Sequence, residues 1–275
     1  MKLPRLTIAA ALALSILGAV LASALFAPLL APYALNEVIG TSWDPPSAEA
    51  LLGTDNLGRD LLSRLIWGAR VTLLIAFVAT ALAFLIGGVS GFVAGLYRGK
   101  IDVVLNQVND LLMAIPSLIV ALVVLTIFPS SLTLIITVMA VLDSTRVFRI
   151  SRSLVLDVTA MDYVEAAKLR GEGSASILWR EVLPNVFAPL LAEFGLRLVF
   201  AILFLSTLSF LGLGVQPPSS DWGGLLKENK DGIVFGVWAA LSPGIAIAVL
   251  AISINIVVDW WLDWTQRSSR GGQDV

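Results

Sequence analysis

Long apolar segments alternate with short polar ones along almost the whole 275-residue sequence. Six of the apolar segments approach the length of about 20 residues that an α-helix needs to cross the hydrocarbon core of a membrane. The pattern therefore predicts an all-α polytopic membrane protein, one domain over residues 1–275 with six transmembrane helices. The predicted spans cover residues 7–30, 71–96, 111–128, 132–148, 186–213 and 233–258.

The first apolar segment has two interpretations. Basic residues precede it, and the sequence Ala-Ser-Ala at residues 22–24 is typical of a site at which a secretory signal peptide is cleaved. The apolar segment is, however, longer than the core of a signal peptide and continues beyond that site. We therefore interpret it as the first membrane span.

Glycine marks one face of the second span. Residues 87, 88, 91 and 95 are all glycine, at spacings that place small residues along one side of a helix. Such a face allows a neighbouring membrane helix to approach closely. The second span is therefore predicted to pack tightly against another helix.

Charged residues occur in two of the later spans. The fourth apolar run ends at Asp143, and its helix is expected to continue past the membrane as far as Arg152. In the fifth span, Glu193 and Arg197 have the spacing and order that favour an ion pair along one helix. An ionisable residue inside a span is a functional candidate, but a pair near the end of a span is expected to be structural.

The first long polar segment, residues 31–70, is predicted to be periplasmic and contains the motif GTDNLGRD. Asp55, Arg59 and Asp60 can form local charge pairs, and Asp60 can begin an amphipathic helix that leads into the second span. Two roles are open: ion pairs and caps that fix the loop at the membrane surface, which we favour, or contact with a substrate-delivery protein. The motif residues considered as a site are Gly53, Asp55, Gly58, Arg59 and Asp60.

The second long polar segment, residues 160–185, is predicted to form two short helices. Asp162 and Glu165 fit a capping box at the start of the first helix, and Gly171 fits a left-handed residue at its end. Ser174 can cap the second helix, and Pro184 can mark its end. Two short helices at an angle make a compact projection, which we call the knob, and such a projection suits docking to another protein.

The distribution of lysine and arginine predicts the orientation of the chain. With a cytoplasmic N-terminus, twelve of these residues fall in inside segments and five in outside segments, as the excess of positive charge in cytoplasmic loops requires. Both termini and the knob are therefore predicted to be cytoplasmic. The inside residues are Lys2, Arg5, Arg98, Lys100, Arg146, Arg149, Arg152, Lys168, Arg170, Arg180, Arg267 and Arg270, and the outside residues are Arg59, Arg64, Arg70, Lys227 and Lys230.

Composition supports a membrane protein and excludes several kinds of function. The mean hydropathy is +0.90, and only 14% of residues are charged, against about 25% in soluble domains. The chain has no histidine and no cysteine, which excludes Ser-His-Asp triads, histidine zinc motifs and disulfides. No P-loop motif for ATP occurs either. The chain is therefore predicted to be a non-enzymatic subunit without metal, cofactor or bound nucleic acid.

Three motifs resemble those of a known family. The knob sequence EAA, a glycine four positions further on and a later LPN resemble the EAA loop of ATP-binding-cassette (ABC) importer permeases. With GTDNLGRD and the segment LSFLGLG, which a Trp-Gly pair follows, the chain resembles the dipeptide/oligopeptide/nickel permease family, in the subunit with a short periplasmic region. By this resemblance the residues that couple to the ATPase are Glu165, Ala166, Ala167, Gly171, Leu183, Pro184 and Asn185.

The resemblance implies a type I ABC importer fold in a bacterial or archaeal cytoplasmic membrane. The chain would form half of a translocation path for peptides or a related small solute. Its implied partners, besides membrane lipid, are a homologous second permease, two ATP-binding subunits and an extracytoplasmic substrate-binding protein. Closure of the ATP-binding subunits around ATP would pull two knobs together and rock the helices from an inward-open to an outward-open state.

Two positions depart from the pattern of that family. Glu181 stands where relatives often have histidine, which adds an acid to the predicted docking surface. Leu205 stands where relatives often have glutamate, so the substrate stays open among peptides, nickel chelates, opines and oligosaccharides. A channel, a secondary transporter or a membrane enzyme is disfavoured, because the spans contain few ionisable groups.

Overall fold

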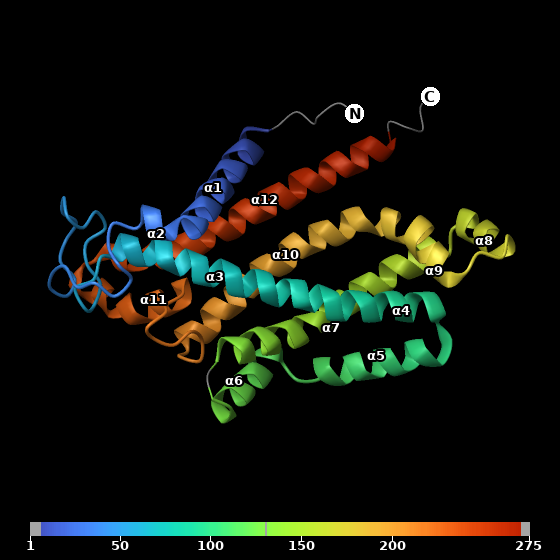
Figure 1. Ribbon diagram of the computed structural model, residues 1–275, viewed down its shortest axis with the longest axis horizontal. Helices are drawn as coiled ribbons and strands as arrows, with labels where there is room; N and C mark the ends of the chain where they lie inside the picture. The colour runs from blue at the N-terminus through green and yellow to red at the C-terminus, as the bar shows by residue number, and fades with distance from the viewer. Residues whose placement is uncertain (1–6, 130, 271–275) are drawn as a thin grey trace. The chain divides into compact units, whose positions relative to one another are not determined.

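The computed structural model describes residues 7–129 and 131–270. In that part of the chain every regular element is a helix, so the predicted all-α fold class is confirmed (Figure 1). The α-helices are α1 (Ile8–Leu25), α2 (Ala27–Leu30), α3 (Leu61–Ala83), α4 (Val89–Tyr97), α5 (Gly99–Met113), α6 (Ser117–Ile127), α7 (Leu132–Thr159), α8 (Asp162–Leu169), α9 (Ser174–Ile177), α10 (Leu183–Phe210), α11 (Trp222–Asn229) and α12 (Ser242–Arg270). Two π-helical turns, η1 (Phe84–Gly88) and η2 (Leu178–Val182), and two 3-10 helices, η3 (Lys230–Phe235) and η4 (Trp238–Leu241), complete the list.

The described residues form two compact units. The first unit is drawn from Met1–Phe77, Val124–Ile136 and Leu198–Val257. The second unit is drawn from Val78–Val123, Thr137–Arg197 and Val258–Val275. The GTDNLGRD motif and α11 belong to the first unit, and the knob belongs to the second.

In the first unit, α11 packs against the start of α3 (Figure 1). Trp222 is 2% exposed, and its indole Nε1 donates a hydrogen bond of 2.8 Å to the carbonyl oxygen of Leu65. Gly68 lies beside the same ring, since a Cβ atom at this position would be 3.0 Å from Trp222 Cδ1. The polar segment over 216–232 therefore contains a helix that the pattern of apolar segments does not reveal.

In the second unit, the predicted glycine face packs against α7. A Cβ atom on Gly91 would lie 2.6 Å from the carbonyl oxygen of Phe148, and one on Gly95 would lie 2.7 Å from Cβ of Val155. No larger residue fits at this separation of the two backbones. The predicted close approach is confirmed, and α7 is the neighbouring helix.

Length and composition identify fewer spans than the six predicted. Within the described residues, four helical segments are long and apolar enough to cross a membrane: Ile8–Leu25, Leu61–Tyr97, Ser174–Phe210 and Ser242–Thr265. A fifth is obtained if α5 and α6, which are bent by 75° to each other, count as one span. The remaining predicted span belongs to α7, which runs on to Thr159 as expected and carries three charged residues in its first two thirds. Six spans stay a prediction.

Two predicted spans have different boundaries in the structure. The span predicted over 111–128 is interrupted between α5 and α6, where Pro116 disfavours a helical conformation of the residue before it. The last span begins at Ser242 rather than at residue 233, because η3 and η4 occupy the preceding residues. Its helix continues to Arg270, beyond the predicted end of the span at residue 258.

Some sequence expectations concern residues outside the described part of the chain. They are the basic residues Lys2 and Arg5 of the orientation argument.

Candidate functional site

The first helix of the knob ends in the left-handed turn that its sequence predicts. α8 stops at Leu169, and Gly171 has a φ angle of +81°. Gly171 N donates to the carbonyl oxygen of Lys168 at 2.9 Å, and Glu172 N donates to that of Ala167 at 3.2 Å, which together form a Schellman motif. A Cβ atom at Gly171 would meet no atom within 4 Å. The backbone angle, and not crowding, is therefore what requires glycine.

The predicted caps at the two helix starts of the knob are wrong. Asp162 is the first residue of α8, and its N-cap Met161 makes no side-chain capping bond, so no capping box forms. Ser174 is likewise the first residue of α9, behind the N-cap Gly173. Burial of the apolar residues that follow, and not capping by side chains, defines where these helices lie.

Pro184 does not end the second helix of the knob, contrary to the prediction. α9, η2 and α10 form one helical segment from Ser174 to Phe210. Pro184 is the second residue of α10 and lies two residues after the end of the π-helical turn η2, which contains Arg180, four residues before the proline. A proline ring normally clashes with the carbonyl group at that distance along the chain. The wider π-helical turn displaces this carbonyl, so the helix continues past the proline.

A buried apolar core holds the knob together. Val164 and Ala167 of α8 pack with Ile177, Val182 and Val186 of the second helical segment, and none of these side chains is more than 4% exposed. The core also includes Val155 near the end of α7. In the EAA motif, Ala167 thus belongs to the core, whereas Glu165 and Ala166 are exposed. The knob is a packed projection and not a solvated loop.

The LPN residues are divided in the same way between core and surface. Leu183 packs against the core, while Pro184 and Asn185 are exposed. Asn185 Nδ2 donates to the hydroxyl oxygen of Tyr163 at 3.1 Å and to the carbonyl oxygen of Glu181 at 2.6 Å. Asn185 therefore joins the two helical segments of the knob at its surface.

The outer surface of the knob presents large apolar side chains. Leu169 is 84% exposed and Trp179 is 68% exposed, and Met161 and Tyr163 are 51% and 42% exposed. Exposed apolar side chains of this size, outside the predicted spans, are typical of a surface that binds another protein. Charged residues accompany them, and those exposed on the knob include Glu165, Lys168, Arg170 and Arg180.

Two acids adjust the charge of this surface. Arg170 donates to Glu172 Oε1 at 2.7 Å, and hydrogen bonds from Arg170 and Ser176 lower the pKa of Glu172. Burial and, to a smaller extent, the carboxylate of Glu181 raise the pKa of Tyr163. Glu181, the acid at the position where relatives often have histidine, therefore lies close enough to Tyr163 to act on this surface.

A second group of residues, which we call the motif cluster, connects the GTDNLGRD motif to α11. It consists of Asp55, Arg59, Arg64 and Glu228. Asp55 accepts hydrogen bonds from Arg59 Nε at 2.7 Å and from Arg64 Nη1 at 2.5 Å. Glu228 of α11 accepts from the same two arginines, at 3.0 Å and 2.6 Å. The side chains of Asp55 and Arg64 are 0% and 2% exposed, so the two charges compensate each other inside the first unit.

The sequence predicts only part of the motif cluster. The pair Asp55–Arg59, four residues apart, is confirmed. Asp60 begins the helix into the second span as predicted, because its Oδ2 caps the start of α3 by accepting from Ser63 N at 2.8 Å. Arg64 and Glu228 were missed as partners. Arg64 carries only a weak signal at nine residues from Asp55, and Glu228 lies too far along the chain for any spacing rule.

Further bonds attach α11 to the rest of the first unit. Trp222 N donates to Thr72 Oγ1 at 3.0 Å, and Asn56 N donates to Asn229 Oδ1 at 3.0 Å. Asp221 caps α11 by accepting from Gly223 N at 3.1 Å, and burial raises the pKa of Asp221 to about 6. GTDNLGRD and the Trp-Gly pair, which are far apart in sequence, therefore belong to one packed assembly.

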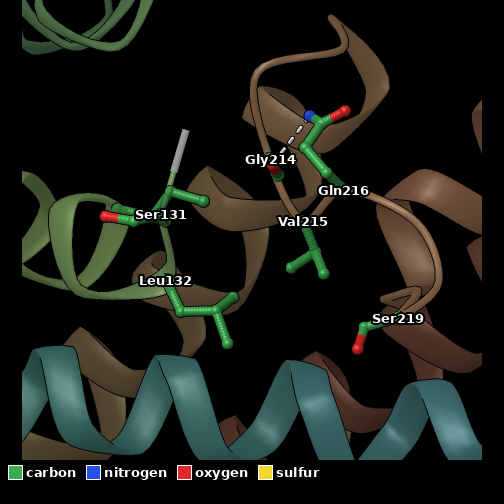
Figure 2. Close-up of a pocket in the computed structure, with 7 residues that line it drawn as sticks. Ser131, Leu132, Gly214, Val215, Gln216 and Ser219 are labelled. Carbon is green, nitrogen blue, oxygen red and sulfur yellow. Dashed lines mark hydrogen bonds between the residues drawn. The ribbon is translucent and has the colours of Figure 1, made fainter. Parts of the chain in front are cut away.

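A small cavity lies near the LSFLGLG segment, between the start of α7 and the loop that follows α10 (Figure 2). Its volume is about 170 Å³, below the 300–1,000 Å³ or so of typical ligand pockets. Gln216 Nε2 donates to the carbonyl oxygens of Gly212 and Gly214 at 3.1 and 3.0 Å, so this amide is bound by its own loop. The cavity is too small for a peptide, and we do not assign the transported solute to it.

Ionisable groups in the predicted spans are paired. The predicted pair is confirmed, with Glu193 Oε1 at 2.7 Å from Arg197 Nε. Arg197 also reaches Asp143 of α7, with Nη1 at 3.4 Å from Oδ1. Leu205, where relatives often have glutamate, is 0% exposed and contributes to the apolar core. In the described residues, no group of three or more acidic side chains could hold a metal ion.

Comparison with protein families gives one match that covers most of the chain. The family described as "binding-protein-dependent transport system inner membrane component" matches residues 87–271. This range includes the knob, α11 and α12, and it begins after the motif GTDNLGRD.

Several curated proteins are similar over nearly the full chain. A putative peptide transport system permease protein of Brucella suis biovar 1 is 37% identical over 85% of this chain and 80% of its own length. The di/tripeptide transport system permease protein DppC of Pseudomonas aeruginosa is 37% identical over 86% of this chain and 80% of its own length. The peptide transport system permease protein SapC of Escherichia coli O6:H1 is 38% identical, over 86% and 82%.

Among solved structures, the chain is similar to an amino acid ABC transporter crystallised with histidines. The TM-score is 0.55 at 19% sequence identity, and the match covers 74% of this chain and 93% of the other. At this identity the likeness concerns the fold alone. It agrees with the helical membrane fold predicted from the apolar segments.

Proposed function

The chain belongs to the family of binding-protein-dependent transport system inner membrane components and so is the permease subunit of an ABC importer, and we propose that its knob is the docking surface for a separate ATPase. The observation that carries this proposal is the combination of a rigid apolar core with exposed Leu169 and Trp179. A rigid projection transmits force, and exposed apolar side chains supply the contact area that a stable interface needs.

The ATPase-coupling residues that the sequence indicates divide into two roles in this proposal. Ala167 and Leu183 shape the projection from inside, and Gly171 sets the turn between its helices. Glu165 and Pro184 lie on the surface that meets the ATPase. ATP is bound and hydrolysed by the partner subunit, since this sequence has no P-loop motif.

The chain is a multi-pass inner membrane protein, and we propose six spans with both termini in the cytoplasm. α7 and the bent pair α5 and α6 supply the two spans that composition alone does not establish. The lysine and arginine count supports this orientation. The knob then faces the cytoplasm, where ATP is found, and the motif cluster faces outward, where a substrate-binding protein would dock.

An importer permease works with other ABC components, and we propose a specific set of partners. They are a homologous second permease, two ATP-binding subunits and an extracytoplasmic substrate-binding protein. Closure of the ATP-binding subunits would move the two knobs toward each other and change the access of the path between the permeases. The knob core, packed onto the end of α7, would carry this motion into the membrane.

Peptides are the proposed substrates, because the similar proteins are described as peptide permeases. The buried position of Leu205 leaves the related solutes open, since an acid that relatives often carry there is replaced by an apolar residue inside the core. Nickel chelates, opines, glutathione-like peptides and oligosaccharides are the alternatives. Uptake by the reconstituted transporter with its own binding protein decides among them.

Cross-linking tests the docking proposal directly, because the chain has no cysteine of its own. Leu169→Cys and Trp179→Cys place single thiols on the knob, and Val234→Cys is the matched control because Val234 is 85% exposed and belongs to the first unit. In membranes that contain the whole transporter, a short thiol-to-amine reagent should link the knob cysteines to an ATP-binding subunit. Absence of this product from both knob variants, or an equal yield from Val234→Cys, would contradict the proposal.

A further inference from the structure

A group of four charged residues joins the two helices that enter and leave the knob. We call it the α7–α10 contact, and it consists of Asp143 and Arg146 on α7 and of Glu193 and Arg197 on α10. Arg197 Nη1 lies 3.4 Å from Asp143 Oδ1, and Arg197 Nε lies 2.7 Å from Glu193 Oε1. These three side chains are only 11%, 17% and 13% exposed. The contact lies within the second unit.

Each helix carries its own compensating charge in this contact. Glu193 and Arg197 are paired four residues apart on α10. On α7, Arg146 Nη1 lies 3.9 Å from Asp143 Oδ1, three residues away along the chain. An unpaired buried charge is strongly destabilising, but separation of α7 from α10 would leave none in this contact, because Asp143 would keep Arg146 and Arg197 would keep Glu193. The bond between the helices can therefore break at a lower cost than an ordinary buried ion pair.

The two contacts of Arg197 to acids described above differ in geometry. The hydrogen bond across the helices, from Arg197 Nη1 to Asp143 Oδ1, is long at 3.4 Å, whereas the ion pair with Glu193 within α10 is close at 2.7 Å but lacks hydrogen-bond geometry. Asp143 Oδ2 is buried and accepts no hydrogen bond from the described residues. Asp143 is thus held loosely by Arg197 and has an oxygen atom free for another donor.

The knob core connects the same helices in a different way. There Val155 of α7 and Val186 of α10 are both fully buried in an apolar cluster. Val155 follows Asp143 by 12 residues, or about 18 Å along a helix, and Val186 precedes Arg197 by 11 residues, or about 16 Å. If the core acts as a fulcrum, a tilt of about 10° between the helices moves the charged contact by about 3 Å at this distance. This displacement is enough to break a bond of 3.4 Å.

We propose that the Asp143–Arg197 bond is broken and remade in each transport cycle. In the state described by the structure the bond holds α7 and α10 together. When ATP binding moves the knob, the helices tilt, Asp143 turns to Arg146 on its own helix, and Arg197 stays with Glu193. Asp143 and Arg197 are then positioning residues, which act on transport through the relative tilt of the helices that carry the knob. This inference rests on the proposed function of the knob.

A fixed brace is the competing explanation, and the two make different predictions. A brace is present in every state, so its removal changes stability but does not shift the balance between states. A bond that exists only before ATP binding stabilises that state alone. Its removal therefore shifts the population toward the ATP-bound state, since only differential interactions move an equilibrium.

The experiment uses the complete transporter in lipid nanodiscs, with Asp143→Asn, Arg197→Gln and the double variant. The quantity measured is the ATP concentration that gives half-maximal trapping of nucleotide in the presence of vanadate. Each single variant should lower this concentration by about fivefold or more, which is the lower range of typical coupling between sites. The double variant should lower it no further than Arg197→Gln alone, because the bond between the helices is already absent in that variant. Unstimulated ATP hydrolysis should rise in parallel.

Asp110→Asn is the matched control. It removes another ion pair of α7, in which Arg149 Nη2 lies 2.7 Å from Asp110 Oδ1, outside the α7–α10 contact. Its half-trapping concentration should equal that of the parent. If Asp143→Asn or Arg197→Gln does not assemble, Arg197→Lys keeps the charge but loses the two-pronged geometry that reaches both acids. It should shift the concentration in the same direction by a smaller factor.

The outcomes separate this inference from the proposed function. An unchanged half-trapping concentration in assembled variants, or a shift that is additive in the double variant, would overturn the inference and leave the docking role of the knob intact. Failure of the parent chain to assemble with the ATP-binding subunits would overturn both.

Discussion

Removal of the Asp55 carboxylate should loosen the GTDNLGRD loop far more than removal of an exposed carboxylate nearby. Asp55 is fully buried and accepts four hydrogen bonds. The donors are Leu57 N at 2.8 Å, Arg59 N at 2.9 Å, Arg59 Nε at 2.7 Å and Arg64 Nη1 at 2.5 Å. Asp55→Ala leaves two backbone donors and two arginines without this acceptor, in a site from which water is largely excluded.

The size of the expected loss of stability depends on the contacts that the two arginines keep in Asp55→Ala. Loss of one partner of a buried ion pair costs about 3–5 kcal/mol. Glu228 still accepts bonds from both arginines and is 27% exposed, so the lower end, about 3 kcal/mol, is expected. Glu228→Gln should cost less, about 1–2 kcal/mol, because this acid is partly hydrated.

Hydrogen–deuterium exchange measures this local loss of stability. The amides to follow include Asp55 N, which donates to the carbonyl oxygen of Arg59 at 2.9 Å, and Ile39 N, which donates to that of Gly58 at 2.9 Å. A loss of about 3 kcal/mol corresponds to exchange that is about two powers of ten faster. Glu49→Gln, at an exposed acid of the same loop, is the control. The reasoning would be refuted if Asp55→Ala exchanged within a few-fold of Glu49→Gln.

Three further predictions concern orientation, pH and helix packing. Single cysteines at Ser47 and Ser219 should react with an impermeant thiol reagent that is added to intact cells, after permeabilisation of the outer membrane if there is one. A single cysteine at Ser174 should not react, and labelling of Ser174→Cys would contradict the predicted orientation. The pKa of Asp221 is raised from 3.8 to about 6, so its contribution to stability is present below pH 3.8 and is lost as pH rises through about 6, by at most about 3 kcal/mol. The thermal unfolding temperature of the purified transporter should therefore depend less on pH in this window for Asp221→Asn, which keeps the cap, than for the parent chain. An identical dependence on pH in both proteins would contradict the assignment of this effect to Asp221. Gly91→Leu, whose Cβ would lie 2.6 Å from the carbonyl oxygen of Phe148, should lower the yield of folded protein sharply, whereas Gly18→Leu, with no atom within 4 Å, should not.

The sequence predicts those features that depend on residues close together in the chain. The left-handed Gly171 follows from a helix-forming run that ends in glycine, and the pairs Asp55–Arg59 and Glu193–Arg197 follow from the spacing of one helical turn. The glycine face is equally local, because it needs only the helical period. All four predictions are confirmed by the geometry.

Other features depend on contacts that no local pattern encodes. Arg64 meets Glu228, which is 164 residues away, and Asp143 meets Arg197, which is 54 residues away. α11 was missed because its stability comes from the burial of Trp222 against α3 and not from a long apolar period. The prediction that Pro184 ends a helix is wrong for a related reason. A π-helical turn, which sequence patterns do not reveal, lets the helix continue past this proline.

These long-range contacts give each group of motif residues a physical task. The motif cluster and α11 make the GTDNLGRD loop part of a packed assembly in the first unit. The knob core gives the EAA segment a fixed shape in the second unit. The buried side chains in both places hold the fixed shape that the proposed docking to a partner requires.

Coupling of the knob to ATP hydrolysis is the central claim, and one pair of variants tests it most directly. Gly171 and Gly236 have φ angles of +81° and +78°, and at neither residue would a Cβ atom meet another atom within 4 Å. Valine at either residue therefore introduces the same backbone strain, about 1–2 kcal/mol or more, but only Gly171→Val distorts the knob.

The measurement is substrate-binding-protein-stimulated ATP hydrolysis by the transporter reconstituted in proteoliposomes. The account predicts that Gly171→Val assembles with the second permease but loses most of the stimulated hydrolysis, at least about tenfold, which a misplacement of the order of 1 Å is enough to cause. Gly236→Val should retain hydrolysis near that of the parent chain. Equal stimulation in Gly171→Val and Gly236→Val would contradict the account, because the shape of the knob would then have no part in coupling.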